Sequence, residues 1–78
     1  MSIKQPVISG KDLVQLLIKN GFEITRVNGS HHRLKNNIGK FTTVPVHGNE
    51  AIPKGLLRKI IREDLDISME DFILMMRK

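Results

Sequence analysis

Residues 22–46 read FEITRVNGSHHRLKNNIGKFTTVPV, and their pattern predicts a small antiparallel sheet. Ile, Thr and Val, which favour strands, recur on both sides of two turn signals. Asn28-Gly29-Ser30 is the first of these turns and the second lies in residues 36–39, so the chain should reverse twice. Pro45 has no N–H to donate and is expected near a strand end or on a sheet edge. The predicted strands cover residues 22–28, 31–35 and 41–46.

A helix is predicted before this sheet, over residues 9–20, after an extended leader that ends near Ile8. Ser9 can accept an early backbone N–H, and Asp12 lies favourably against the helix dipole. Gly21 is a natural stop, because glycine adopts the left-handed conformation at low cost. Apolar residues recur at helical spacing in between, at Leu13, Val14, Leu16, Leu17 and Ile18.

A second helix is predicted after the sheet and opens at Pro53, a residue type that suits the first helical position. Its apolar residues fall on one arc and are Leu56, Leu57, Ile60 and Ile61. At about 100° per residue, the basic residues Lys54, Arg58 and Arg62 form a stripe on the opposite side, with Lys59 near it. This helix is therefore expected to be amphipathic, with a basic outer face.

A short third helix is predicted after Ser68, which can cap it. Glu70 and Asp71 fall in its first turn and Arg77 and Lys78 in its last, so the charges match the dipole at both ends. Its apolar residues surround the helix, and such a helix needs burial. Packing on its own domain is the simpler explanation, and a contact with a second copy or another protein is the alternative.

These elements predict a single α+β domain over residues 1–78, since a chain this short cannot build two hydrophobic cores. The order is helix, three antiparallel strands, helix and short helix. The domain divides into a leader at 1–8, a core at 9–67 and a C-terminal helix at 68–78.

The charge is placed unevenly along the chain, although the formal net charge is only +5 at pH 7. Residues 1–62 hold eleven basic and three acidic side chains, a net of +8. Residues 63–78 hold two basic and five acidic side chains, a net of −3. The basic part suits a polyanionic partner. Aromatic side chains are limited to three Phe, so binding of nucleic acid should run mainly through charge and shape.

Several classes of protein are disfavoured by what the sequence lacks. It has no cysteine, which removes disulfides, thiolate zinc sites and cysteine nucleophiles. Its start shows no hydrophobic signal region, and the longest apolar run, Phe72 to Met76, is far below the roughly 20 residues that span a bilayer. A cytoplasmic protein with no membrane segment is therefore expected.

Three histidines, His31, His32 and His47, are the candidates for proton transfer, because histidine is the side-chain type that changes charge near neutral pH. Successive strand residues point to opposite faces of a sheet. If Leu34 faces the helices, His32 faces them too; the reverse orientation would put Leu34 in water and is disfavoured. The solvent-facing residues of this strand are then His31, Arg33 and Lys35.

Four interpretations of these histidines compete on the residues alone. They could be ordinary strand and loop residues. Metal binding is disfavoured, because the adjacent pair diverges on a strand and neither cysteine nor nearby carboxylates assist. A serine triad through Ser30 lacks a neighbouring acid and the nucleophile-elbow pattern. The fourth is acid–base work on bound RNA, whose 2′-OH supplies the nucleophile, so that a histidine and cations near the phosphate could suffice without a metal.

The cations for such chemistry could come from two places. Arg33, Lys35 and Lys40 belong to the hairpin region, and the basic stripe of the second helix could add phosphate contacts. A solvated basic face is the simpler interpretation, and the spacing does not decide between the two.

Five segments keep one order along residues 9–67 and carry a resemblance to a known family. They are the helix 9–20, Gly21-Phe22, Gly29-Ser30-His31-His32-Arg33-Leu34, Thr43-Val44-Pro45-Val46-His47, and the helix start Ile52-Pro53-Lys54-Gly55-Leu56-Leu57-Arg58-Lys59-Ile60-Ile61. Together they resemble the HicA family of toxins, small mRNA interferases of type II toxin–antitoxin systems. Gly-Ser-His alone would be a weak signal, and the Val-Pro-x-His segment with the following helix makes it specific.

The resemblance implies a double-stranded-RNA-binding-domain-like fold, α-β-β-β-α, with both long helices on one face of the sheet. It also implies metal-independent endoribonuclease activity without a cofactor, with His31 as the catalytic general acid or base and His32 as the reserve candidate. Gly29 and Ser30 would shape the turn that presents His31. With the cations above, the expected RNA-binding residues are Gly29, Ser30, Arg33, Lys35, Lys40, His47, Lys54, Arg58 and Arg62.

The resemblance further implies two partners, mRNA and a HicB-type antitoxin whose acidic groups would suit the basic part of the chain. A homodimer through the C-terminal helix is a further expectation. The alternative function is a non-catalytic RNA-binding module of the same fold. A structural or interaction protein, the third possibility, would show no salt-sensitive RNA binding.

Overall fold

Three strands pair antiparallel in the order β1-β2-β3 in the computed structural model, which describes residues 3–77. The strands are β1 (Glu23–Asn28), β2 (His31–Lys35) and β3 (Phe41–Pro45). Asn28 pairs with His31, so the first reversal has a two-residue loop. Gly29 occupies its first position with a φ of 61°, in the left-handed region that a type II′ hairpin turn requires there.

β1 contains a bulge at Thr25 that the sequence pattern did not predict. Ile24 pairs with Leu34 and Arg26 pairs with Arg33, which leaves Thr25 as the extra residue. The Thr25 hydroxyl donates to the Arg33 carbonyl at 3.3 Å. Because directly paired residues share a face, Arg26 lies beside Arg33.

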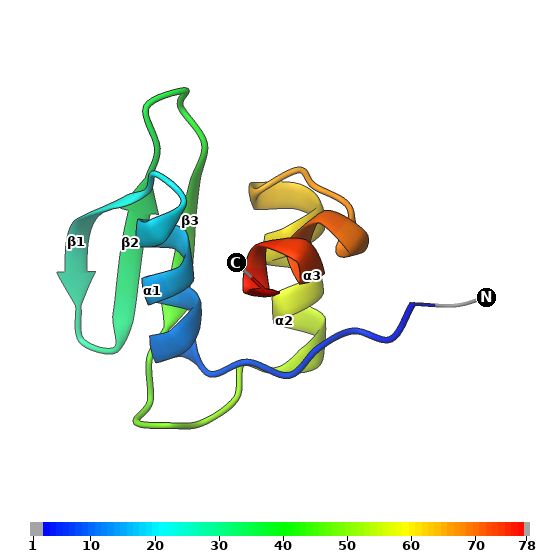
Figure 1. The fold of residues 1–78 in the computed structure, drawn as a ribbon. Coiled ribbons are helices and arrows are strands. Elements are labelled where there is room, and N and C mark those ends of the chain that lie inside the picture. The colour runs from blue at the N-terminus through cyan, green and yellow to red at the C-terminus, as the bar shows by residue number, and fades with distance from the viewer. Residues whose placement is uncertain (1–2, 78) are drawn as a thin grey trace.

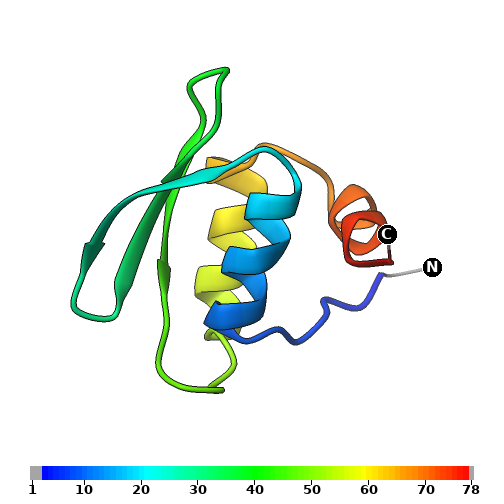
Figure 2. The same ribbon diagram turned by 60° about the vertical axis from the view of Figure 1, so that its left-hand side comes forward.

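The helices α1 (Gly10–Lys19) and α2 (Lys54–Lys59) lie on the same side of the sheet (Figure 1; Figure 2). Ser9 caps α1, because its hydroxyl accepts the Asp12 N–H at 3.1 Å. The order α-β-β-β-α and the α+β class are therefore confirmed. The core lies between the sheet and these helices and continues on their far side to Phe72. It consists of Ile8, Leu13, Val14, Leu17, Phe22, Leu34, Val44, Ile52, Leu57, Ile60, Ile61, Leu65 and Phe72.

The second helix departs from prediction where α2 continues into a π-helical turn, η1 (Ile60–Asp64). The Leu65 N–H donates to the Ile60 carbonyl at 2.8 Å, a bond that spans five residues instead of four. Asp66, with a φ of 55°, follows in the left-handed conformation that commonly ends a helix. Asp64 ends this turn, and its carboxylate accepts a hydrogen bond from Thr42 of β3.

The C-terminal helix α3 (Met69–Arg77) lies on the side of the other helices that faces away from the sheet (Figure 2). The Ser68 hydroxyl accepts the Asp71 N–H at 3.0 Å, which confirms the predicted cap. Phe72 is completely buried, so α3 packs on its own domain, and Leu74 and Met76 remain exposed.

The N-terminal leader runs extended beside the start of α2 (Figure 1). The Ile52 N–H donates to the Ile8 carbonyl at 2.9 Å. Met1, Ser2 and Lys78, which belong to the predicted leader and last helix, lie outside the described residues. Within residues 3–77, no helix combines the length and the apolar character that crossing a bilayer demands.

Candidate active site

His31 begins β2 and is exposed on the outer face of the sheet, defined as the face away from α1 and α2. Leu34 is fully buried on the opposite face, and His32 is partly buried there. Strand alternation therefore acts as the sequence predicted. In β3, Pro45 pairs with His31 and Thr43 pairs with Arg33, so these residues share the outer face.

A hollow of about 500 Å³ opens beside His31, where β3 forms the edge of the sheet. Its sheet side is formed by His31, Arg33, Phe41, Thr42, Thr43 and Pro45. Its helix side is formed by Leu56, Lys59 and Asp64. This site, named the His31 hollow, thus brings together β2, β3 and the α2–η1 helix.

Arg33 lies on the outer face of the sheet and lines the hollow. Its guanidinium carbon is 5.2 Å from the centre of the Phe41 ring, within the range of a cation–π contact. Phe41 sits at the opposite end of β3 from Pro45, and its side chain is 55% exposed. The Phe41 ring therefore holds the Arg33 guanidinium at an exposed part of the hollow.

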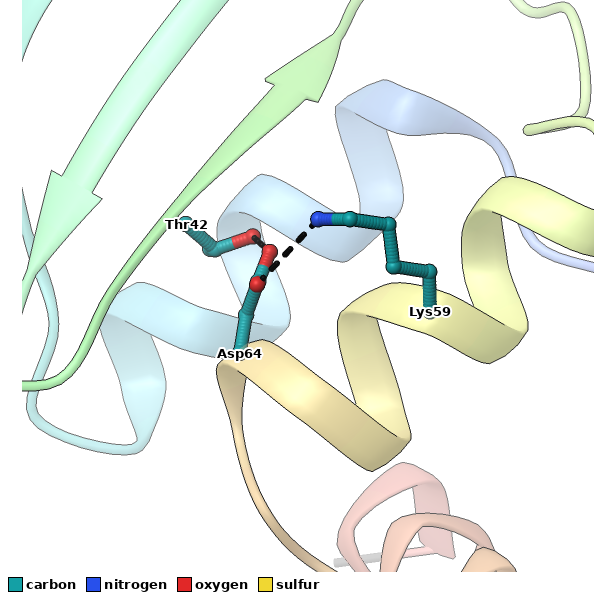
Figure 3. Close-up of polar contacts among 3 residues, drawn as sticks. All are labelled: Thr42, Lys59 and Asp64. Atoms are coloured by element: carbon teal, nitrogen blue, oxygen red, sulfur yellow. Dashed lines mark hydrogen bonds and ion pairs between the residues drawn. The ribbon is translucent and has the colours of Figure 1, made fainter.

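On the helix side, one carboxylate connects the sheet to a lysine (Figure 3). The Thr42 hydroxyl, which is almost fully buried, donates to Asp64 Oδ2 at 2.7 Å. Lys59 Nζ lies 3.4 Å from Asp64 Oδ1. Both oxygens of the carboxylate are therefore engaged, one by β3 and one by α2.

The other two histidines do not line the hollow. His32 faces the helices, and its Nδ1 is 3.4 Å from the Ser30 carbonyl oxygen. His47 is exposed in the loop after β3, which is held near the hairpin turn because the Val46 N–H donates to the Ser30 carbonyl at 2.7 Å. Gly29 and Ser30 form the turn directly before His31, as expected. Among the three histidines, it is His31 that lines the hollow.

Two of the expected RNA-binding lysines have other surroundings. Lys35 lies four residues along β2 from His31, about 13 Å at roughly 3.3 Å per residue, and pairs with Glu23 of β1. Lys40 Nζ donates to the Leu65 carbonyl at 2.6 Å. The Lys40 ammonium thus connects the start of β3 to the end of η1, and its predicted contact with RNA stays a prediction.

The basic stripe of the second helix is exposed and lies next to the hollow. Arg58 and Arg62 line a shallow depression together with Lys59 and Glu63. Since Lys59 also lines the His31 hollow, it joins the two surfaces. Lys54 stands apart at the start of α2 and lines neither.

Two residues that line the hollow, Lys59 and Phe41, were not expected there from the sequence, and neither was Arg26 beside Arg33 on the sheet. Helical spacing placed Lys59 near the basic stripe, and only the arrangement of the π turn and β3 shows that it lines the same hollow as His31. Phe41 could have been found from the alternation of β3, in which Thr42 and Val44 are buried. Arg26 could have been found from the hairpin register, which places it opposite Arg33.

The hollow combines an imidazole with two cations and a single carboxylate. An imidazole can accept or donate a proton, and the cations can stabilise a phosphate that gains negative charge. Within residues 3–77, no group of three or more His, Cys, Asp and Glu side chains gathers as a metal would need. The arrangement suits proton transfer at a bound phosphodiester.

Comparison with protein-family models gives one match, to a model described as "HicA toxin of bacterial toxin-antitoxin", over residues 10–65. The matched range runs from α1 to the residue after η1 and includes both sides of the His31 hollow. No curated protein and no solved structure matches the chain.

Proposed function

Because the chain belongs to the HicA toxin family, we propose that it is an endoribonuclease that cleaves mRNA with His31 as general acid or base. Members of this family are toxins of bacterial toxin–antitoxin systems, which implies an antitoxin partner. RNA cleavage, its target and the role of His31 are our proposal, as is a cytoplasmic location, where mRNA is found.

The observation that carries the proposal is the position of His31 in one hollow with Arg33 and Lys59. In a transesterification, the RNA 2′-oxygen bonds to the adjacent phosphorus while the bond to the 5′-oxygen breaks. The 2′-OH loses a proton and the 5′-oxygen gains one, giving a 2′,3′-cyclic phosphate and a 5′-OH. His31 would carry out one of these proton transfers, and the cations would stabilise the charge on the phosphorane.

Purified protein incubated with RNA in the presence of a chelator tests this function and its independence of metal. The wild type should produce fragments, and His31→Ala should slow cleavage by about 10²- to 10⁴-fold, the usual contribution of a general acid or base. Circular dichroism and thermal unfolding of His31→Ala should match the wild type, because this side chain is exposed.

Each other outcome of this experiment corresponds to a different conclusion. If folded His31→Ala cleaves as fast as the wild type, the catalytic assignment is wrong, and loss of activity in His32→Ala alone would transfer the role to His32. Wild-type protein that binds RNA and yields no fragments would be a non-catalytic RNA-binding module.

We also propose that a HicB-type antitoxin with acidic groups covers the His31 hollow. The charge of the site supports this, because Arg33, Lys59 and the adjoining Arg58 and Arg62 outnumber the carboxylates beside them. A homodimer through α3 stays a prediction. The buried Phe72 is already used inside the domain, and Leu74 and Met76 are the exposed large apolar residues that α3 offers for such a contact within residues 3–77.

A further inference from the structure

We infer that Lys59 is a phosphate-binding cation of the His31 hollow and that Asp64 is the residue that positions it. The inference rests on the proposed function, because it names a second group that would contact the RNA beside His31. Neither Lys59 nor Asp64 belongs to the RNA-binding residues that the sequence predicts. Their placement depends on the helix distortion and on β3.

The Asp64 carboxylate is fixed from the sheet (Figure 3). Thr42 is 2% exposed in β3, and its hydroxyl donates to Asp64 Oδ2 at 2.7 Å. The other oxygen, Oδ1, lies 3.4 Å from Lys59 Nζ, so a long flexible side chain is directed toward an anchored group. In Figure 3 Thr42 and Lys59 approach Asp64 from two different elements.

The π turn is what places Asp64 within reach of Lys59. Residues five apart on an α-helix are about 500° apart at 100° per residue, which leaves them about 140° apart around the axis. The bond from the Leu65 N–H to the Ile60 carbonyl closes a wider turn, in which residues five apart come close to one another. In a continuous α-helix Glu63, four residues on, would neighbour Lys59 instead. The π turn thus gives Lys59 the anchored Asp64 as its partner at the hollow, in place of Glu63.

Stability alone does not account for this pair. The Lys59 side chain is 53% exposed and that of Asp64 is 21% exposed. Exposed ion pairs contribute little to folding, and holding a lysine in one geometry costs side-chain entropy. A lysine ammonium has three N–H donors, and Asp64 takes one of them. The others can serve an anion that enters the hollow.

The anion that fits is a phosphate within an extended RNA backbone. Lys59 lines the His31 hollow on one side and the depression of Arg58 and Arg62 on the other. A chain of phosphates could therefore run from His31 past Lys59 to this pair of arginines. A single free phosphate would occupy only the hollow, and the adjoining arginines of the depression would have no ligand.

Binding is tested with a short single-stranded RNA whose riboses are 2′-O-methylated, so that the nucleophile is blocked. Lys59→Met should reduce the slope of log Kd against log salt concentration by about 0.7, the value for one lost phosphate contact on a single strand. Lys11→Met is the matched control, because it removes the same charge from an exposed site on α1. An unchanged slope in Lys59→Met would overturn the phosphate contact.

Cleavage of unmodified RNA tests the positioning role. Lys59→Met should lower kcat by about 10²-fold, as expected for loss of one charge-stabilising group, and Lys59→Arg should restore most of it. Asp64→Asn keeps an oxygen that can accept from Thr42 but loses the ion pair. It should bind RNA at least as tightly as the wild type, because a negative charge is gone, yet kcat should fall about 10- to 100-fold.

The outcomes separate this inference from the proposed function. If the wild type cleaves RNA and Lys59→Met or Asp64→Asn has an unchanged kcat, the inference is wrong while the function stands. If the wild type does not cleave RNA, the function fails, and with it any role of these residues in cleavage. The salt slope then still decides whether Lys59 contacts phosphate.

Discussion

Gly10 lies where α1 approaches β3 most closely. A Cβ atom built on this residue would stand 1.9 Å from the Pro45 carbonyl oxygen, a backbone atom that cannot move aside like the end of a side chain. Pro45 pairs with His31 and lines the hollow. The absence of a side chain at Gly10 therefore lets the helix support one side of the candidate site.

Gly10→Ala should destabilise the protein by about 1–3 kcal/mol, the usual cost of overpacking. For a domain of this size the midpoint of thermal unfolding should fall by roughly 5–20 °C. Gly55→Ala is the matched control in α2, where an added Cβ would meet nothing within 4 Å. It should keep or raise stability, because alanine favours helix. Equal melting of Gly10→Ala and the wild type would show that the helix can shift away from β3.

The orientation of single residues could be predicted only where an alternating pattern was present. The apolar Leu34 fixed the direction of every side chain in β2, and His31 was correctly placed on the outer face. No comparable pattern linked Lys59 to His31, because they lie 28 positions apart in the sequence. They line one hollow only because α2 and β2 lie on either side of the edge strand β3. Lys40 was expected to contact RNA because of its charge, and that stays a prediction; its bond to the Leu65 carbonyl, 25 positions away, could not be predicted from the sequence.

At the scale of elements, α3 completes the core from the side away from the sheet. It contributes Phe72, which is fully buried with Ile60, Ile61 and Leu65 in the same cluster. The neighbouring Leu74 is 54% exposed. One face of this helix therefore supports the helix that carries Lys59 and Asp64.

Phe72→Ala should cost about 3–5 kcal/mol, because it removes a large buried side chain and leaves a cavity. Leu74→Ala shortens a residue of the same helix that is largely exposed, and should change stability by less than about 0.5 kcal/mol. Urea unfolding of the two variants measures the difference. Similar midpoints would mean that α3 does not contribute to the cooperative core.

Local signals predicted the ends of the helices better than their interiors. The helix predicted over residues 9–20 from Ser9 and Gly21 agrees with α1 within one residue at each end, because caps and turns depend on the side chains found there. The bulge at Thr25 and the π turn of η1 were missed. Both insert one residue into a regular pattern in response to tertiary contacts, and such an insertion leaves no mark in the local composition.

For the whole molecule, the uneven charge should appear as a strong dependence of RNA affinity on salt. Four cations, Arg33, Arg58, Lys59 and Arg62, line the hollow and the adjoining depression. About four phosphate contacts to single-stranded RNA correspond to a slope near −2.8. Between 50 and 200 mM salt the affinity of the wild type should therefore fall about 50-fold.

Fluorescence anisotropy with a labelled single-stranded RNA measures this dependence, and circular dichroism at each salt concentration controls for unfolding. A flat response would indicate an interaction protein without a nucleic-acid function. A slope of log affinity against log salt concentration that is clearly steeper than −1 would support RNA binding along the hollow and the depression.

The leader and the last helix both lie far from the outer face of the sheet. Val7 and Met76 line one depression, and Figure 2 places the leader and α3 on the side of the helices away from the sheet. Ends that both lie on the surface away from the candidate site are compatible with circular permutation. A linker long enough to span them could join them on that side, and new ends could be opened in the loop 36–39 between β2 and β3. In such a permuted chain His31 and Lys59 would be brought together by a different order of the same elements.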